Sequence, residues 1–146
     1  MTYFDRTYGA VEYDESLETV VGRIHDYAEG EEFRAYMNAI IDAVEATGSE
    51  ILLADSREMG PIAQEDQVWS IEDWSPRAES AGLSAIAFVM PESVIAGMSF
   101  ERVMSMAEGD DIDRAYFEDP AQARDWLRDW SAPDVTAEPG GQLQAE

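Results

Sequence analysis

The chain has 146 residues, of which 45% are hydrophobic, so it is long and apolar enough for one domain with a hydrophobic core. It has no cysteine, which excludes disulfides, thiolate catalysis and cysteine-ligated metal centres. The 32 Asp and Glu residues outnumber 9 basic residues and give a net charge of -23. No basic stripe can therefore neutralise the phosphates of a nucleic acid.

The acidic residues are spread along the chain, and every basic residue is an arginine. At low ionic strength this much like charge repels itself and weakens the compact state. In molar salt the Debye length falls to ~3 Å, and the same charge is tolerated as a hydrated surface. We therefore expect a protein adapted to the salt-filled cytoplasm of a halophile.

No apolar run approaches the ~18 residues that a membrane span needs, and we find no signal-peptide pattern. We expect a cytoplasmic protein without membrane insertion.

The first third of the sequence predicts a hairpin followed by a helix. Residues 10–13 and 17–23 have the composition of two strands, with a polar turn between them. Residues 31–46 predict a helix, because apolar residues recur at helical spacing, and Gly48 follows as a C-terminal stop. The apolar residues of this helix are Phe33, Met37, Ile40, Ile41 and Val44.

Two continuous apolar runs, at residues 51–54 and 83–89, predict strands that are buried on both faces. Between them, residues 64–81 predict a second helix, and Pro76 predicts a kink or break near Trp74. The residues that we expect on the inward face of this helix are Val68, Ile71, Trp74 and Ala78.

The last part of the sequence predicts a helix, a strand and another helix. Residues 93–107 indicate one interrupted helix or two short ones, and residues 112–117 indicate a short strand. Asp119 and Pro120 are typical of a helix start. Residues 131–146 have the composition of a disordered acidic tail.

The predicted order is β-β-α-β-α-β-α-β-α. Alternating buried strands and helices indicate an α/β fold with a mostly parallel sheet and an antiparallel hairpin at its start. We expect one domain over residues 1–130.

This order, together with specific segments, resembles the STAS-like domains of anti-sigma-factor antagonists, and most closely small stand-alone SpoIIAA-like proteins. These proteins are grouped with STAS domains and with CRAL-TRIO lipid-exchange domains. The resemblance implies a single-domain STAS-like fold, and it does not imply an enzyme. The matching segments are EEFRAYMNAI (31–40), ILLADSREMG (51–60), QEDQVWSIEDWSPRAESAGL (64–83), IAFVMPE (86–92), MSFERV (98–103) and YFEDPAQARDWL (116–127).

The sequence departs from this family at the family's phosphorylation site. Anti-sigma antagonists carry an Asp-Ser-Ser-Gly-like segment there, whereas residues 61–65 of this chain read Pro-Ile-Ala-Gln-Glu. Ser56 lies too far back to substitute for the family's serine. The resemblance therefore implies partner binding without a phospho-serine switch.

The residues predicted to bind a partner or ligand lie in two places. Asp55, Ser56 and Arg57 follow the strand at 51–54, where open α/β sheets place their sites. An ordinary turn with an Asp55–Arg57 ion pair is the alternative interpretation. Trp69 and Arg77, on the second helix, are candidates for an interface.

No residue set predicts catalysis, a metal site or a cofactor, so we do not expect an enzyme. We expect a cytoplasmic regulatory module that binds a protein partner through the turn after residue 54 and the start of the second helix. The alternative is a binder of a small apolar ligand or lipid, held between the second helix and the methionine-rich residues 90–106. A pocket of about 300 Å³ or more would favour that alternative. Homodimerisation through an exposed helix face is a further expectation.

Overall fold

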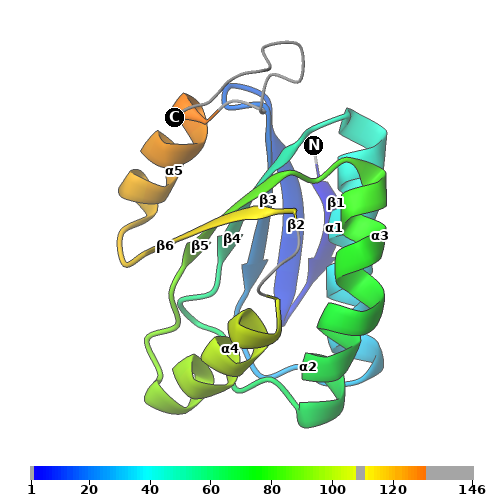
Figure 1. The fold of residues 1–146 in the computed structure, drawn as a ribbon, viewed down its shortest axis with the longest axis vertical. Helices are drawn as coiled ribbons and strands as arrows, with labels where there is room; N and C mark the ends of the chain where they lie inside the picture. Colours follow the sequence, from blue (N-terminus) through cyan, green and yellow to red (C-terminus); the bar gives the residue numbers. More distant parts are fainter. Residues whose placement is uncertain (1, 108–110, 131–146) are drawn as a thin grey trace.

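The computed structural model describes residues 2–107 and 111–130, so the tail expected at 131–146 lies outside the described residues. Six strands form one sheet in chain order (Figure 1). The strands are β1 (Thr2–Arg6), β2 (Gly9–Asp14), β3 (Thr19–Ile24), β4 (Ile51–Asp55), β5 (Ala85–Val89) and β6 (Asp113–Phe117). The helices are α1 (Glu31–Thr47), α2 (Gln64–Trp69), α3 (Ser75–Ala81), α4 (Val94–Met106) and α5 (Pro120–Asp129). A π-helical turn, η1 (Ser70–Trp74), joins α2 to α3.

The sheet is antiparallel at its start and parallel afterwards, as the sequence predicted. β1, β2 and β3 pair antiparallel, while β3, β4, β5 and β6 pair parallel. The α/β class is therefore confirmed. The predicted order is wrong at its beginning, because β1 adds a third strand before the first helix. This strand is an exposed edge strand without a buried apolar run, so the sequence pattern did not predict it.

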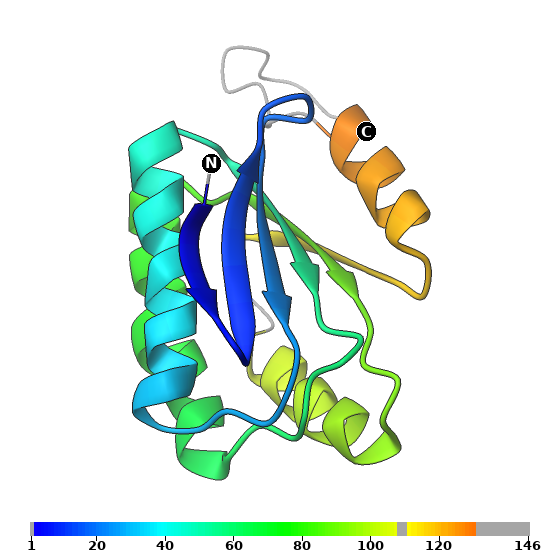
Figure 2. The same cartoon turned by 180° about the vertical axis from the view of Figure 1, so that it is seen from behind.

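The helices are divided unequally between the two faces of the sheet. α1, α2, η1, α3 and α4 enclose the larger core on one face, and α5 covers β4, β5 and β6 on the other. Figures 1 and 2 show α5 standing apart from the other helices, while α1 and α3 run side by side. The predicted strands at 51–54 and 83–89 are buried in the structure because both faces of this region are covered.

Local chemistry explains the helix ends. Gly48 ends α1 with φ 73°, a left-handed conformation that glycine adopts without steric cost. The Asp119 side chain accepts a hydrogen bond from the Ala121 amide at 2.9 Å, and it thereby caps α5 where the sequence predicted a helix start. The Ser93 hydroxyl accepts from the Ala96 amide at 3.3 Å and begins α4. α4 is one continuous helix, so the predicted interruption is wrong.

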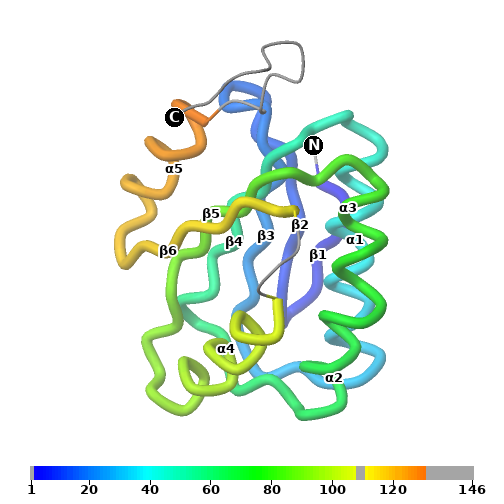
Figure 3. Tube along the Cα trace, viewed as in Figure 1, coloured from blue at the N-terminus to red at the C-terminus, as the bar shows by residue number. Residues whose placement is uncertain are grey.

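The second predicted helix is one rod with a wide turn in its middle (Figure 3). The predicted kink or break near Trp74 takes the form of this π-helical turn, which ends at Trp74, and the helix then continues without interruption through Pro76. Trp74 and Ala78 point inward as predicted, but Val68 is 40% exposed. Ser70 is buried instead, because the π-helical turn changes which residues before it face the core.

Candidate functional site

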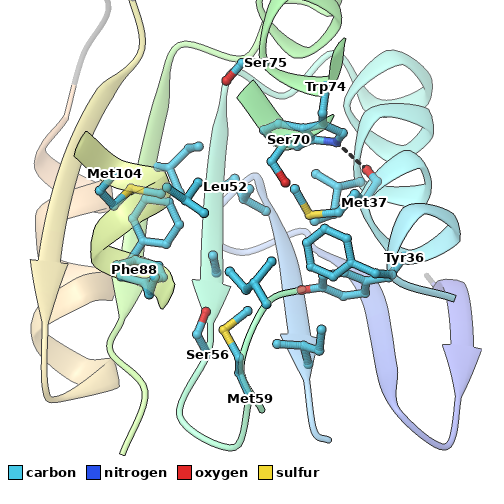
Figure 4. Close-up of a pocket in the computed structure, with 18 of the residues that line it drawn as sticks. Tyr36, Met37, Leu52, Ser56, Met59, Ser70, Trp74, Ser75, Phe88 and Met104 are labelled. Atoms are coloured by element: carbon cyan, nitrogen blue, oxygen red, sulfur yellow. Dashed lines mark hydrogen bonds between the residues drawn. The ribbon is translucent and has the colours of Figure 1, made fainter. Parts of the chain in front are cut away.

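A cavity of about 80 Å³ lies inside the larger core, between the sheet and the helices of that face (Figure 4). Strands β4 and β5 form its floor, and α1, the α2–η1–α3 rod and α4 form its walls. Its lining is mainly apolar, from the sheet side chains Leu52, Ile86 and Phe88 to Trp74 and Phe100 on the helices. The cavity is thus part of the core layer and is built by elements from most of the chain.

Three methionines from different elements also line the cavity. Met37 comes from α1, Met59 from the loop after β4, and Met104 from α4. Methionine is unbranched and polarizable, so it adapts to an irregular space better than branched side chains do. The walls of this cavity can therefore change shape at little cost.

Four hydroxyl groups interrupt the apolar lining, from Tyr36, Ser56, Ser70 and Ser75. The Ser70 hydroxyl donates to the Asp66 carbonyl oxygen at 2.8 Å, and the Ser75 hydroxyl accepts from Arg114 at 3.5 Å. No hydrogen bond joins the Tyr36 or Ser56 hydroxyl to another residue of the described ranges. These two hydroxyls point toward the space between sheet and helices in Figure 4.

Tyr36 is almost fully buried, with 4% of its surface exposed. Burial raises the pKa of its hydroxyl, and the nearby carboxylate of Asp55 raises this pKa further. The group therefore remains a neutral O–H donor at physiological pH. Ser56 is similarly buried, with 5% exposed.

The π-helical turn fixes the upper wall of the cavity. The Trp74 indole N–H donates to the Met37 carbonyl oxygen at 2.7 Å, which locks the ring across α1. Single π-helical turns are frequent at functional sites, because they redirect side chains within an otherwise regular helix. Here the turn brings Ser70 and Trp74 to the same cavity.

Asp55 and Arg57 form the ion pair that the alternative interpretation of this turn predicted. Arg57 donates to the two carboxylate oxygens of Asp55 at 3.0 and 2.7 Å. Burial raises the pKa of Asp55, but the hydrogen bonds from Arg57 outweigh it and hold that pKa below its ordinary value. Arg57 also borders a small polar pocket of about 110 Å³ beside His25 and Glu58.

Ser56, which lies between Asp55 and Arg57 in the sequence, has a different environment from theirs. Asp55 shares a face of β4 with Leu53, which packs under α5. Ser56 lines the cavity on the helical side. The three consecutive residues predicted as one site are thus divided between two pockets.

Trp69 and Arg77 lie together on the outer side of the helical layer. The Arg77 guanidinium lies 5.8 Å from the Trp69 ring centroid, and Arg34 approaches the same ring at 5.1 Å. Trp69 also packs edge-to-face on Phe33. Arg77 is bonded to Asp73 and so takes part in an ordinary ion pair. Neither residue lines the cavity, so the structure does not bring them to Ser56.

Comparison with protein-family models, with curated proteins and with solved structures finds no match to this chain. The STAS-like resemblance therefore stays a prediction. Among the residues that the structure describes, no group of three or more metal-ligating side chains is placed to hold an ion. None of the helices in the described ranges has the length and apolar character that a membrane crossing requires.

Proposed function

We propose that this chain is a non-enzymatic STAS-like module that binds a small, mainly apolar ligand in the cavity between its sheet and its helices. The observation that carries the proposal is an apolar space in the core that two buried hydroxyls face without partners among the described residues. Native cores are close-packed, and buried polar groups are normally hydrogen-bonded. An apolar space in the core with hydroxyls turned toward it has the features of a binding site.

The cavity volume limits the size of the ligand. Pockets for drug-sized molecules occupy about 300 Å³ or more, whereas this cavity holds about 80 Å³. An engineered apolar cavity of about 150 Å³ accepts benzene or xenon. The ligand is therefore a compact molecule of a few non-hydrogen atoms, and the three methionines of the wall adjust to its shape.

Xenon tests this proposal, because a single apolar atom needs little space and no polar partner. The methionine methyl groups, labelled with carbon-13, report its position by NMR in molar KCl. We expect the signals of Met37, Met59 and Met104 to shift, since these residues line the cavity. Met98 and Met106 are 52% and 42% exposed and serve as internal controls. Equal small shifts of all methionines, or none, would contradict the proposal.

A second candidate function is binding of a protein partner, and the exposed apolar residues of α4 favour it. Val94, Ile95 and Met98 are 79%, 66% and 52% exposed at the start of this helix. Contiguous exposed apolar residues often mark protein interfaces. In this interpretation Ile95→Asp abolishes a stoichiometric complex isolated from the host in molar KCl, whereas Trp69→Ala tests the interface predicted at the second helix. A complex that survives Ile95→Asp and is lost in Trp69→Ala assigns the interface to the second helix.

A further inference from the structure

The cavity has a polar end, formed by a hydroxyl on α1 and a hydroxyl just after β4. Tyr36 and Ser56 supply these groups, and each residue is more than nine-tenths buried. In Figure 4 both hydroxyls point toward the central space, and neither bonds to a described residue. A buried hydroxyl without a partner loses the hydrogen bonds that it makes in water. A ligand that accepts hydrogen bonds would restore them.

The cost of burying a charge selects the kind of acceptor. Charges of both signs lie near this end of the cavity, because Asp55 raises the Tyr36 pKa, Arg23 lowers it, and Asp55 is itself paired with Arg57. The chain as a whole carries a net charge of -23. A ligand carboxylate or phosphate would lose its hydration on burial among the apolar side chains of the cavity. An uncharged oxygen avoids this penalty.

The rest of the cavity fits the remainder of such a molecule. Leu52, Phe88 and Trp74 offer only carbon surface to the interior, because the indole N–H of Trp74 is already bonded to Met37. The Ser70 hydroxyl is likewise bonded, to the Asp66 carbonyl. Arg114 and the Ser75 hydroxyl also line the cavity and bond to each other at 3.5 Å. Tyr36 and Ser56 are the lining residues whose hydroxyls have no hydrogen bond to another described residue.

We infer that the cavity selects a compact apolar molecule with one uncharged oxygen acceptor, such as an ether, ketone or alcohol, held by the hydroxyls of Tyr36 and Ser56. This inference rests on the proposed ligand-binding function and specifies the chemistry of its ligand.

Tetrahydrofuran and cyclopentane form a matched pair of probes, because the two rings have the same shape and differ by one ether oxygen. Both are titrated in molar KCl and followed by the methionine methyl signals. The measured quantity is the ratio of the two dissociation constants, cyclopentane over tetrahydrofuran. Comparing this ratio between variants cancels the different hydration of the two probes.

We expect Ser56→Ala and Tyr36→Phe each to lower the ratio about five- to tenfold, the net effect of one hydrogen bond. Ser70→Ala is the control, because its hydroxyl lines the same cavity but is bonded within the protein. It should leave the ratio unchanged. Circular dichroism verifies that each variant is folded.

The outcomes separate this inference from the function on which it rests. The inference is supported if both probes bind, if Ser56→Ala or Tyr36→Phe lowers the ratio, and if Ser70→Ala leaves the ratio unchanged. If cyclopentane binds and the ratio is the same in all variants, Tyr36 and Ser56 do not hold the ligand oxygen. The inference is then wrong, and the ligand-binding function stands. Binding of xenon without either ring overturns the ligand class alone. If neither xenon nor either ring binds, the ligand-binding function and the inference are both wrong.

Discussion

Filling the cavity by one substitution should stabilise the protein. Ala54 lies on β4 and lines the cavity, so Ala54→Val adds two carbon atoms to its interior. At ~24 cal/mol per Å³, an empty space of about 80 Å³ costs about 2 kcal/mol. Burying two more carbons contributes roughly 0.8 kcal/mol each. After loss of some side-chain freedom, we expect the free energy of unfolding to rise by about 1 kcal/mol.

Ala87 provides the matched control, because it is a fully buried alanine on the neighbouring strand β5. Its side chain packs under α5 in the smaller core and does not line the cavity. Ala87→Val therefore overpacks a filled region and should lower the free energy of unfolding by about 1–3 kcal/mol.

Urea denaturation of both variants in the same molar KCl measures this difference, provided that the denaturant slope is unchanged. Ala54→Val should also weaken the xenon-induced shifts of the methionine signals. If Ala54→Val destabilises the protein as much as Ala87→Val does, the space beside Ala54 is not an open cavity. A ligand would then have no space to occupy.

Three further predictions concern charge, pH and packing. Lowering KCl from molar to millimolar should unfold the protein, as followed by circular dichroism, because the net charge of -23 is then less screened; retained structure in dilute buffer would contradict this. Hydrogen bonds from Ser16 and Arg124 lower the pKa of Asp14 to about 2. The stability that this carboxylate contributes is present above its ordinary pKa near 4 and is lost as pH falls toward 2. Asp14→Asn should thus be less stable than wild type at pH 7 but equal to it near pH 2 in urea denaturation, and a difference that persists at pH 2 would contradict the assignment. A Cβ at Gly22 would lie 2.7 Å from the Tyr36 hydroxyl oxygen, so Gly22→Ala should lower the unfolding free energy by about 1–3 kcal/mol. Adding Tyr36→Phe should recover part of this loss, and an additive loss would refute the clash.

The parts of the fold that the sequence predicted correctly are those with a strong local signal. The buried strands β4 and β5 are continuous apolar runs, and α1 has an apolar stripe with a glycine stop. β1 has neither feature, since its pairing depends on β2 and not on its own composition. The inward face of the second helix was only partly predictable, because a π-helical turn interrupts the 3.6-residue period on which that prediction rested.

The candidate site was less predictable than the fold, because a cavity depends on the packing of distant elements. Ser56 was predicted from its place after a buried strand, and it does line the cavity. The sequence could not separate Ser56 from Asp55 and Arg57, which form an ion pair. Tyr36 was missed, although its place three residues after Phe33 and four before Ile40 set it on the inward face of α1. Of the methionines in residues 90–106, Met104 lines the cavity, whereas Met98 and Met106 are exposed.

The central claim is that the interior of this protein holds a ligand-accessible apolar space beside two buried hydroxyls. A crystal structure determined under xenon pressure, from crystals kept in molar KCl, tests it most directly. We expect a xenon atom enclosed by Leu52, Trp74 and Phe88, which are among the side chains that border the cavity. Xenon bound only on the surface, with these side chains closed against one another, would contradict it.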